Sequence, residues 1–454
     1  MGAALPKPVL CTVLERHGSK NFRVGVAEMN GWRTSMEDAH VIHMSDAPPE
    51  GYFGILDGHG GADCSAWCAQ RLQEKLLAEG CPANDAAAKK LILDTDDAYL
   101  KTKLPSGSTA AMCIVRPPAA AGGKWRVHVI NAGDSRVLLS RADGTIVDGG
   151  GTDLGLTTDH KPNWPSERRR IERCGGRVVE AAGGVHRVNG DLAVSRGFGD
   201  AEYKKTGGPR PEDRPVTADP EMGHFECNAT DFVMVVCDGV SEGSLSNADA
   251  CKLAARVMKE TGGDAAKASE AVCHRAVETE SKDNISCMII LLGGADAAGD
   301  SSANAIAMGK QRESRNTFST GSPRTITLGK QRDYQPGSLM GSNNSSFVKA
   351  YVAMCERGGV SFAESVERRY ALLQARKANP EEDDEAELAL IGTPQGPEGS
   401  PARKTWFETW ARDCQERKGG RGDEEEEGGD SEQAMMMKML LMMMRNQGGQ
   451  GGGP

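Results

Sequence analysis

The sequence predicts an α+β fold in which antiparallel sheets are covered by helices. Short apolar segments follow one another over residues 109–140, separated only by turns, and strands without intervening helices are typical of antiparallel sheets. Segments with apolar residues at helical spacing come in pairs, at 62–104 and 246–278. In addition, three apolar strands begin or end at an aspartate, which indicates that the chemistry lies at the strand ends.

The elements of the expected domain can be assigned in order. Residues 1–21 are expected to be a lead-in to a domain that spans residues 22–293. Alternating or continuous apolar segments predict strands, and four-residue apolar steps predict helices. The expected strands are 22–29, 41–44, 52–56, 109–115, 125–131, 136–140, 232–237 and 284–292. The expected helices are 62–78, 85–104, 246–260 and 264–278, and the Arg- and Gly-rich segment 160–210 is expected to be an irregular excursion.

The composition changes after Gly293. Residues 294–350 are rich in Ser, Asn and Gly and are predicted to be a linker, whereas residues 351–454 are predicted to be a partly helical, mostly disordered tail with acidic, Met-rich and Gly-rich runs. Tail helices are expected at 362–377 and 404–418. The tetrapeptide Gly-Lys-Gln-Arg occurs twice, at 309–312 and 329–332. It is either a docking element or a neutral duplication.

Composition also limits the class of protein and its surroundings. The net charge of −10 implies no basic surface, so we expect no nucleic-acid partner. Thirteen cysteines without a CxxC pair indicate a reducing compartment, and we expect the cytoplasm, the nucleus or both. No stretch approaches the ~20 apolar residues of a transmembrane helix. Gly2 would permit N-myristoylation, but Pro6 stands where the signal has Ser or Thr.

Acidic residues mark the ends of four strands. Asp57 follows one strand, Asp238 follows another, Asp283 precedes a third, and the pair Glu37-Asp38 precedes a fourth. Clustered carboxylates raise one another's pKa values unless cations neutralise them. Oxygen ligands suit Mg²⁺ or Mn²⁺, and two such ions ~4 Å apart can activate a water for phosphoryl transfer. The alternative reading of Asp57 alone is a solvated acid in a strand-ending turn.

Two further side chains fit phosphate chemistry. Arg33 could bind phosphate oxygens with two hydrogen bonds, although an isolated arginine is more often a surface residue. His59 could protonate a leaving oxygen, because the ordinary pKa of histidine is near neutrality. The alternative is a histidine that merely occupies the glycine-rich turn.

A resemblance to a known family rests on motifs that occur in order along the chain. The motifs are Gly31-Trp32-Arg33, Met36-Glu37-Asp38-Ala39, Asp57-Gly58-His59-Gly60-Gly61, Ser106-Gly107-Ser108-Thr109-Ala110, Asn131-Ala132-Gly133-Asp134-Ser135-Arg136, Asp159-His160-Lys161-Pro162, Leu192-Ala193-Val194-Ser195-Arg196-Gly197-Phe198-Gly199-Asp200, Asp238-Gly239 and Asp283-Asn284. With this set, the segment from about 22 to 292 resembles the metal-dependent serine/threonine phosphatases of the protein phosphatase 2C family. The resemblance implies a four-layer α-β-β-α sandwich of two antiparallel sheets flanked by helices, with a metal centre at one end.

The resemblance also implies a role for each site residue. Asp57 would bridge two Mn²⁺ or Mg²⁺ ions, the Gly58 carbonyl would hold one, and Asp238 and Asp283 would bind the other. Glu37 and Asp38 would order the metal waters, Arg33 would bind phosphate, and His59 would be the general acid. A possible third ion would use Asp134, which could equally brace a turn, and Glu242, where the family usually has aspartate. Residues 164–205 correspond to a flap, and Asp200 is expected to be structural.

The function implied is hydrolysis of phosphoserine and phosphothreonine in proteins. A hydroxide bridging the two ions would attack phosphorus directly, without a phosphoenzyme. The alternative is a catalytically weak pseudophosphatase that binds phosphoproteins as a regulator. We expect a monomer, phosphoprotein substrates and a tail that binds a regulator or targets the enzyme.

Overall fold

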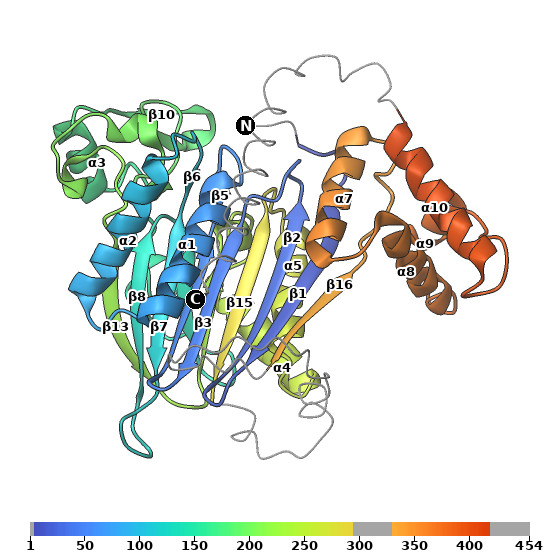
Figure 1. Cartoon of the computed structure of the whole chain (residues 1–454), viewed down its shortest axis with the longest axis horizontal. Helices are drawn as coiled ribbons and strands as arrows, with labels where there is room; N and C mark the ends of the chain where they lie inside the picture. The colour runs from blue at the N-terminus through green and yellow to red at the C-terminus, as the bar shows by residue number, and fades with distance from the viewer. Residues whose placement is uncertain (1–3, 294–328, 418–454) are drawn as a thin grey trace, which may run out of the picture.

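A computed structural model describes residues 4–293 and 329–417 and has the predicted α+β architecture (Figure 1). Two antiparallel sheets pack face to face between helical layers. No helix in the described ranges is long and apolar enough to cross a membrane. Gly2, the first Gly-Lys-Gln-Arg copy, the acidic run at 423–427 and the Met-rich patch lie outside the described residues.

The first sheet has six strands, all paired antiparallel, in the order β16-β1-β2-β15-β14-β9. Its strands are β1 (Val9–Gly18), β2 (Phe22–Gly31), β9 (Arg136–Ser140), β14 (Phe232–Val236), β15 (Ile285–Leu292) and β16 (Gly329–Gln335). Helices α4 (Asn247–Glu260) and α5 (Ala265–Glu278) cover its outer face. Both helices begin at a side-chain cap, at Ser246 and Asp264 respectively.

The second sheet has five antiparallel strands in the order β13-β8-β7-β4-β3. They are β3 (Ala39–Asp46), β4 (Pro49–Leu56), β7 (Ala110–Arg116), β8 (Trp125–Ala132) and β13 (Glu221–Cys227). Helices α1 (Asp63–Glu79) and α2 (Asp85–Leu100) cover its outer face. These helices, like α4 and α5, begin and end within a few residues of the predicted positions, except that α2 ends four residues early.

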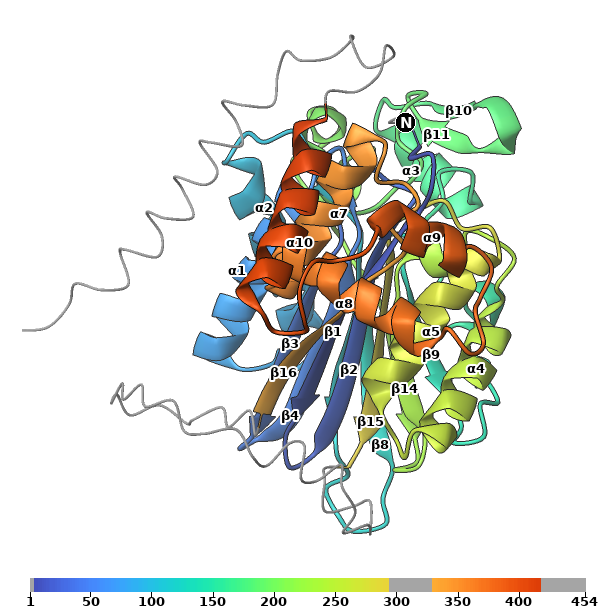
Figure 2. The same cartoon turned by 90° about the vertical axis from the view of Figure 1, so that its right-hand side faces the viewer.

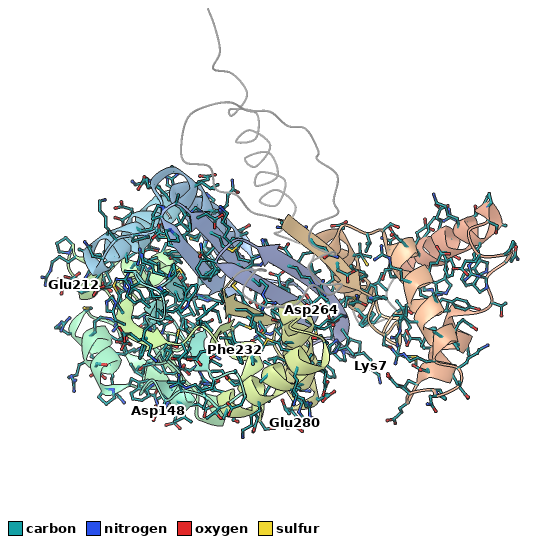
Figure 3. All side chains as sticks on the ribbon, turned by 90° about the horizontal axis from the view of Figure 1, so that it is seen from below. Lys7, Asp148, Glu212, Phe232, Asp264 and Glu280 are labelled. Carbon is teal, nitrogen blue, oxygen red and sulfur yellow. The ribbon has the colours of Figure 1, made fainter. Side chains whose placement is uncertain are left out.

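The apolar strands are continuous because both of their faces are buried. In β14, Val233 and Val235 pack between the two sheets, whereas Met234 and Val236 pack under α4 and α5. Phe232, at the start of β14, lies in the interior, whereas charged residues such as Asp148 and Glu280 lie at the periphery (Figure 3).

A small three-stranded sheet extends one end of the sandwich. Its strands are β5 (Gly58–His59), β6 (Gly107–Ser108) and β12 (Phe198–Gly199), with β6 in the centre. The flap lies between β9 and β13 and contains α3 (Pro165–Arg173) and the hairpin of β10 (Val178–Glu180) and β11 (His186–Val188). The sheet places His59 beside the residues that follow β12.

A buried ionic cluster anchors the flap. The Glu167 carboxylate accepts hydrogen bonds from Arg170 (2.6 Å), from Arg196 (2.7 and 3.0 Å) and from the Ser195 hydroxyl (2.6 Å). Burial opposes ionisation, but Arg196 and Arg170 outweigh it and lower the pKa of Glu167 from 4.5 to about 2. A lowered carboxyl pKa contributes stability that is present above pH 4.5 and is lost as the pH falls towards 2.

Glu167→Gln is therefore expected to lower the free energy of unfolding at pH 7 by roughly 3 kcal/mol. The difference from wild type should narrow as the pH falls below 4.5, because the wild-type carboxylate then gains its proton. Urea unfolding at pH 7 and at a series of lower pH values measures this. Glu172→Gln on the same helix, in an exposed pair with Arg168, is the control and should change little.

Two predicted boundaries are wrong. The lead-in contains β1 (9–18), which lies inside the first sheet, and the predicted linker contains β16 (329–335) and the start of helix α7 (Ser345–Gly358). The second Gly-Lys-Gln-Arg copy begins β16, where Lys330 and Arg332 form ion pairs with the buried Glu15 of β1. The strand was missed because its residues are polar and its partner lies more than 300 positions away.

The described part of the tail is a compact helical unit (Figure 2). It comprises α7, α8 (Phe362–Ala375), α9 (Asp384–Ile391) and α10 (Pro401–Glu416). Val13 of β1 packs with this unit, whereas the adjacent Leu14 packs with the α5 layer. Because successive strand residues face opposite sides, the unit covers the face of β1 that the second sheet leaves free.

Candidate metal centre

The predicted acids converge at one end of the sandwich. Asp57 follows β4 of the second sheet, while Asp238 follows β14 and Asp283 precedes β15, which are neighbours in the first sheet. One ligand atom each of Asp38, Asp57 and Cys237 lies within 4.8 Å of the others. The charges of Asp238 and Asp283 both act on Asp57. Two sheets thus contribute carboxylates to one cluster.

Without bound cations, the negative charges of the buried carboxylates in this cluster repel one another. Burial raises the pKa of Asp38, Asp238 and Asp283 to about 7 each, and a neighbouring carboxylate adds to the rise in every case. Burial and then the charge of Asp238 raise the pKa of Asp57 well above its ordinary range. Burial also raises the pKa of the Cys237 thiol, which keeps it protonated. The remaining donors are oxygens, and they fit hard divalent cations.

The turn after β4 is fixed by its backbone. The Asp57 carbonyl accepts hydrogen bonds from the Thr109 amide (2.8 Å) and the Ser108 hydroxyl (3.1 Å). A Cβ atom on Gly58 would lie 2.4 Å from the Glu37 carbonyl oxygen. A residue with a side chain therefore does not fit at this position without displacing the backbone.

Glu37 and Asp38 connect the two sheets at the cluster. The Glu37 carboxylate accepts from the Gly61 amide (3.2 Å), and the Glu37 amide donates to the Asn284 side chain (2.9 Å). The buried Asp38 carboxylate accepts from the Ser286 hydroxyl (2.7 Å). These contacts hold both acids beside the ends of β4 and β15.

Arg33 lies at the rim of the cluster. Its guanidinium forms an ion pair with Asp283, and its side chain is 49% exposed. Burial lowers the pKa of Arg33, but Asp283 and the other cluster carboxylates outweigh this effect and raise it. A half-exposed guanidinium beside the acids can contact a ligand that enters from solvent.

His59 is held by Asp200, which the sequence alone predicts to be structural. The His59 Nε2 atom lies 2.9 Å from both Asp200 carboxylate oxygens, and Asp200 is buried. Burial lowers the pKa of His59, but the charge and hydrogen bond of Asp200 outweigh this and raise it. The available signal was the position of Asp200 at the end of the Gly-Phe-Gly-Asp motif, whose β12 pairs with β6 beside His59.

The two residues predicted for a third ion have protein partners. Asp134 is buried and forms an ion pair with Lys161, and Glu242 accepts a hydrogen bond from the Lys282 amide (3.0 Å). Both charges raise the pKa of Asp238, so both residues lie near the cluster. The third ion stays a prediction.

Arg357 of α7 reaches the cluster from the tail. Its guanidinium donates to both Glu28 oxygens (2.7 and 2.8 Å) and to the Asp38 carbonyl (2.8 Å). Glu28 is buried in β2, opposite Ser286 of β15. Sequence analysis missed this contact, since nothing at position 357 distinguishes it from other helical arginines.

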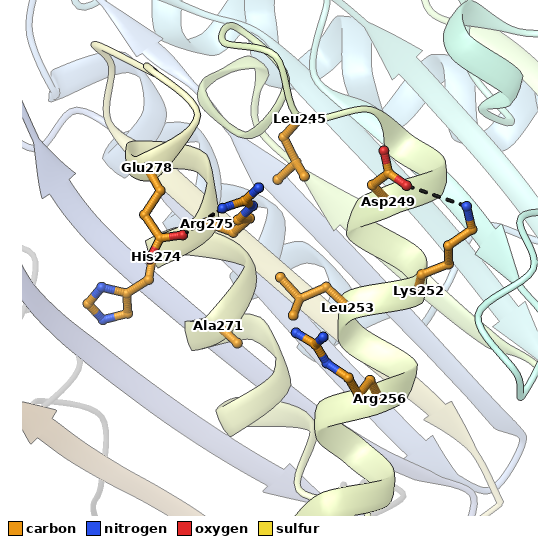
Figure 4. A pocket seen from close by; sticks show the side chains of 9 residues that line it. All are labelled: Leu245, Asp249, Lys252, Leu253, Arg256, Ala271, His274, Arg275 and Glu278. Atoms are coloured by element: carbon orange, nitrogen blue, oxygen red, sulfur yellow. Dashed lines mark hydrogen bonds and ion pairs between the residues drawn. The ribbon is translucent and has the colours of Figure 1, made fainter.

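The surface also has a hollow that lies away from the carboxylate cluster. It has a volume of about 670 Å³ and lies between α4 and α5, where Leu253 and Ala271 face it and charged side chains surround it (Figure 4). No cluster carboxylate lines it. The hollow is therefore separate from the carboxylate cluster.

Comparisons with known proteins agree with this geometry. The family model described as Protein phosphatase 2C matches residues 22–285. Protein phosphatase 2C homolog 2 of Schizosaccharomyces pombe is 33% identical over 294 residues, covering 61% of this chain and 72% of the relative. Human Protein phosphatase 1A is 31% identical over 319 residues, covering 64% and 76% respectively. A crystal structure of a phosphatase from a pathogenic strain of Toxoplasma gondii is similar with a TM-score of 0.55 and 28% identity, over 62% of this chain and 95% of that one.

Proposed function

We propose a mechanism from the premise that this chain belongs to the protein phosphatase 2C family, whose model matches more than half of it. Its relatives support the coarse function, which is that of a protein phosphatase; dependence on a divalent metal is part of the finer proposal. The finer proposal is hydrolysis of phosphoserine and phosphothreonine in proteins. The convergence of Asp57, Asp238 and Asp283 from two sheets is the observation that carries it.

We place two Mn²⁺ or Mg²⁺ ions at the cluster. Asp57, the Gly58 carbonyl, Asp238 and Asp283 would hold them, and Glu37 and Asp38 would order their waters. When bound, the ions would supply an activated water as the nucleophile and positive charge for the phosphate oxygens. The protein contributes a rigid arrangement of carboxylates, because each follows or precedes a buried strand.

Arg33 and His59 act on the substrate. The Arg33 guanidinium has five N–H donors, so it can bind phosphate oxygens while it remains beside Asp283. Because Asp200 engages the Nε2 atom of His59, Nδ1 is the nitrogen that can donate a proton to the leaving serine or threonine oxygen. Asp200 positions the ring and favours its protonated form.

His59→Gln is expected to lower kcat for a phosphoserine peptide by about 10²-fold. The same variant should hydrolyse p-nitrophenyl phosphate almost as fast as wild type, because a nitrophenolate leaves without needing a proton. Steady-state kinetics with both substrates measures the difference. An equal loss for both substrates would contradict the acid role.

The alternative function is phosphoprotein binding without turnover. If the protein is instead an enzyme, as we propose, the full chain should hydrolyse phosphoserine and phosphothreonine peptides in the presence of Mn²⁺, and hydrolysis should stop when a chelator is added. Calorimetric titration with Mn²⁺ separates the two functions, since a catalytic centre of this kind should bind the ion and a non-catalytic one should not. Absence of both turnover and binding in folded protein would favour the alternative.

A further inference from the structure

Two histidines and an aspartate meet on the outer face of the second sheet, away from the carboxylate cluster. His128 of β8 and His224 of β13 are directly opposed across the strand pair, and Asp85 is the first residue of α2. Asp85 Oδ1 lies 2.8 Å from His224 Nε2 and 3.1 Å from His128 Nε2. One ligand atom of each residue lies within 4.8 Å of the other two.

His128 is the buried member of this group. Its side chain is only 5% exposed. Its Nε2 atom lies 3.1 Å from Asp85 Oδ1 but makes no hydrogen bond of acceptable geometry with any residue in the described ranges. A buried polar atom without a hydrogen bond is costly, which singles out this nitrogen. The His128 and His224 rings are stacked with centroids 4.3 Å apart and an interplanar angle of 16°. One ring must therefore rotate before both Nε2 lone pairs can point at the same ion, and the exposed His224 side chain has room to do so.

We propose that His128 Nε2, His224 Nε2 and one Asp85 carboxylate oxygen bind a transition-metal dication such as Zn²⁺. Imidazole nitrogens suit zinc and its neighbours rather than Mg²⁺. The site therefore differs in chemistry from the all-oxygen cluster. Asp85 and His224 are exposed, which leaves solvent access for a water as the fourth ligand.

The electrostatic surroundings agree with this assignment. Burial and then the charge of His224 lower the pKa of His128, so its imidazole is neutral at pH 7, which is the form that binds metal. One other group in the described residues combines two histidines with a carboxylate, namely Glu15, His17 and His40. In that group Lys330 and Arg332 already form ion pairs with Glu15. No such cation pairs with Asp85 among the described residues, whose ionic contacts are with the two histidines.

The bound ion would join three elements. β13 is an edge strand of the second sheet, and α2 lies over that sheet. An ion shared by β8, β13 and the first residue of α2 would link the edge strand and the helix to the sheet. The site is therefore structural, and its loading should raise the unfolding temperature without being needed for turnover.

The test is Zn²⁺ binding by the full chain in excess Mg²⁺, measured by competition with a chromophoric chelator. Wild type and Asp57→Asn should each bind one Zn²⁺. His224→Ala, at an exposed position, should bind Zn²⁺ more than about 100-fold more weakly. Removing a residue that only hydrogen-bonds to a metal ligand already lowers metal affinity by about 10–100-fold, and His224 would be a ligand itself. His186→Ala, a histidine on β11 of the flap, is the matched control and should bind as wild type does.

Further readouts keep the test independent of folding. Zn²⁺ should raise the unfolding temperature of wild type and His186→Ala but not that of His224→Ala, and Co²⁺ should give d–d absorption only where the site is intact. The proposal is wrong if wild type binds no Zn²⁺ in excess Mg²⁺. It is also wrong if His224→Ala and wild type bind Zn²⁺ equally, or if Asp57→Asn abolishes the binding.

Discussion

Asp57→Asn is expected to lower turnover of a phosphoserine peptide by about 10³-fold or more while the protein stays folded. The substitution preserves the volume of the side chain but removes the charge that both ions would share. Loss of several kcal/mol of transition-state stabilisation corresponds to a rate loss of this size. The variant should be compared with wild type at saturating Mn²⁺ by initial rates.

Two comparisons separate this loss from a folding defect. Asp94→Asn, in an exposed pair with Lys90 on α2, is the matched control and should keep wild-type turnover. In the absence of metal, Asp57→Asn should unfold at the same or a higher urea concentration than wild type, because it relieves repulsion from Asp238 and Asp38. Strong destabilisation of Asp57→Asn without metal would contradict the repulsion inferred among these carboxylates.

Arg357→Met is expected to lower the free energy of unfolding by about 2–3 kcal/mol. This is less than the ~3–5 kcal/mol typical for one partner of a fully buried ion pair, because the Arg357 side chain is 31% exposed. The substitution leaves Glu28 in β2 without its guanidinium and removes a donor from the Asp38 carbonyl. Because Asp38 borders the carboxylate cluster, a higher Mn²⁺ concentration should also be needed for half-maximal activity. Urea unfolding and metal-dependent rates measure the two effects.

The matched control for Arg357 is Arg368→Met, which removes an exposed pair with Glu364 on α8 and should cost less than about 1 kcal/mol. The double variant Glu28→Gln/Arg357→Met should recover part of the lost stability, since it removes the buried Glu28 charge, which the single variant leaves with only His40 (2.8 Å) as a partner. Equal effects of Arg357→Met and Arg368→Met would show that the tail contact has no special role.

Truncation after Gly293 would be a poor test of a regulatory tail. It removes β16 and the helical unit, and thereby exposes Val9, Cys11 and Val13 of β1. The resulting protein would lose stability whether or not the tail regulates anything. Arg357→Met is the better test, because it disturbs one contact and leaves the apolar interface in place.

The sequence was sufficient for the elements whose pattern is local. The strands before Asp57 and Asp238 are continuous apolar runs, and an acid with a glycine after such a run is visible without any structure. Motif order then assigned the family and the four-layer fold. Both predictions are confirmed by the family match and by the two packed sheets.

The missed features depend on contacts between distant residues. β16 is polar, and only its pairing with β1 makes it a strand. Asp200 lies 141 positions from His59 and Arg357 lies 319 positions from Asp38, so no local pattern connects either pair. His128 and His224 become a site only because β13 pairs with β8 in one register.

The most direct test of the two-metal proposal is the activity of the full chain on a phosphoserine peptide after metal removal and readdition. We expect no turnover in chelator, full recovery when Mn²⁺ or Mg²⁺ is restored, and no recovery in Asp57→Asn or Asp238→Asn. Full activity in chelator, or in either variant, would contradict the proposed centre.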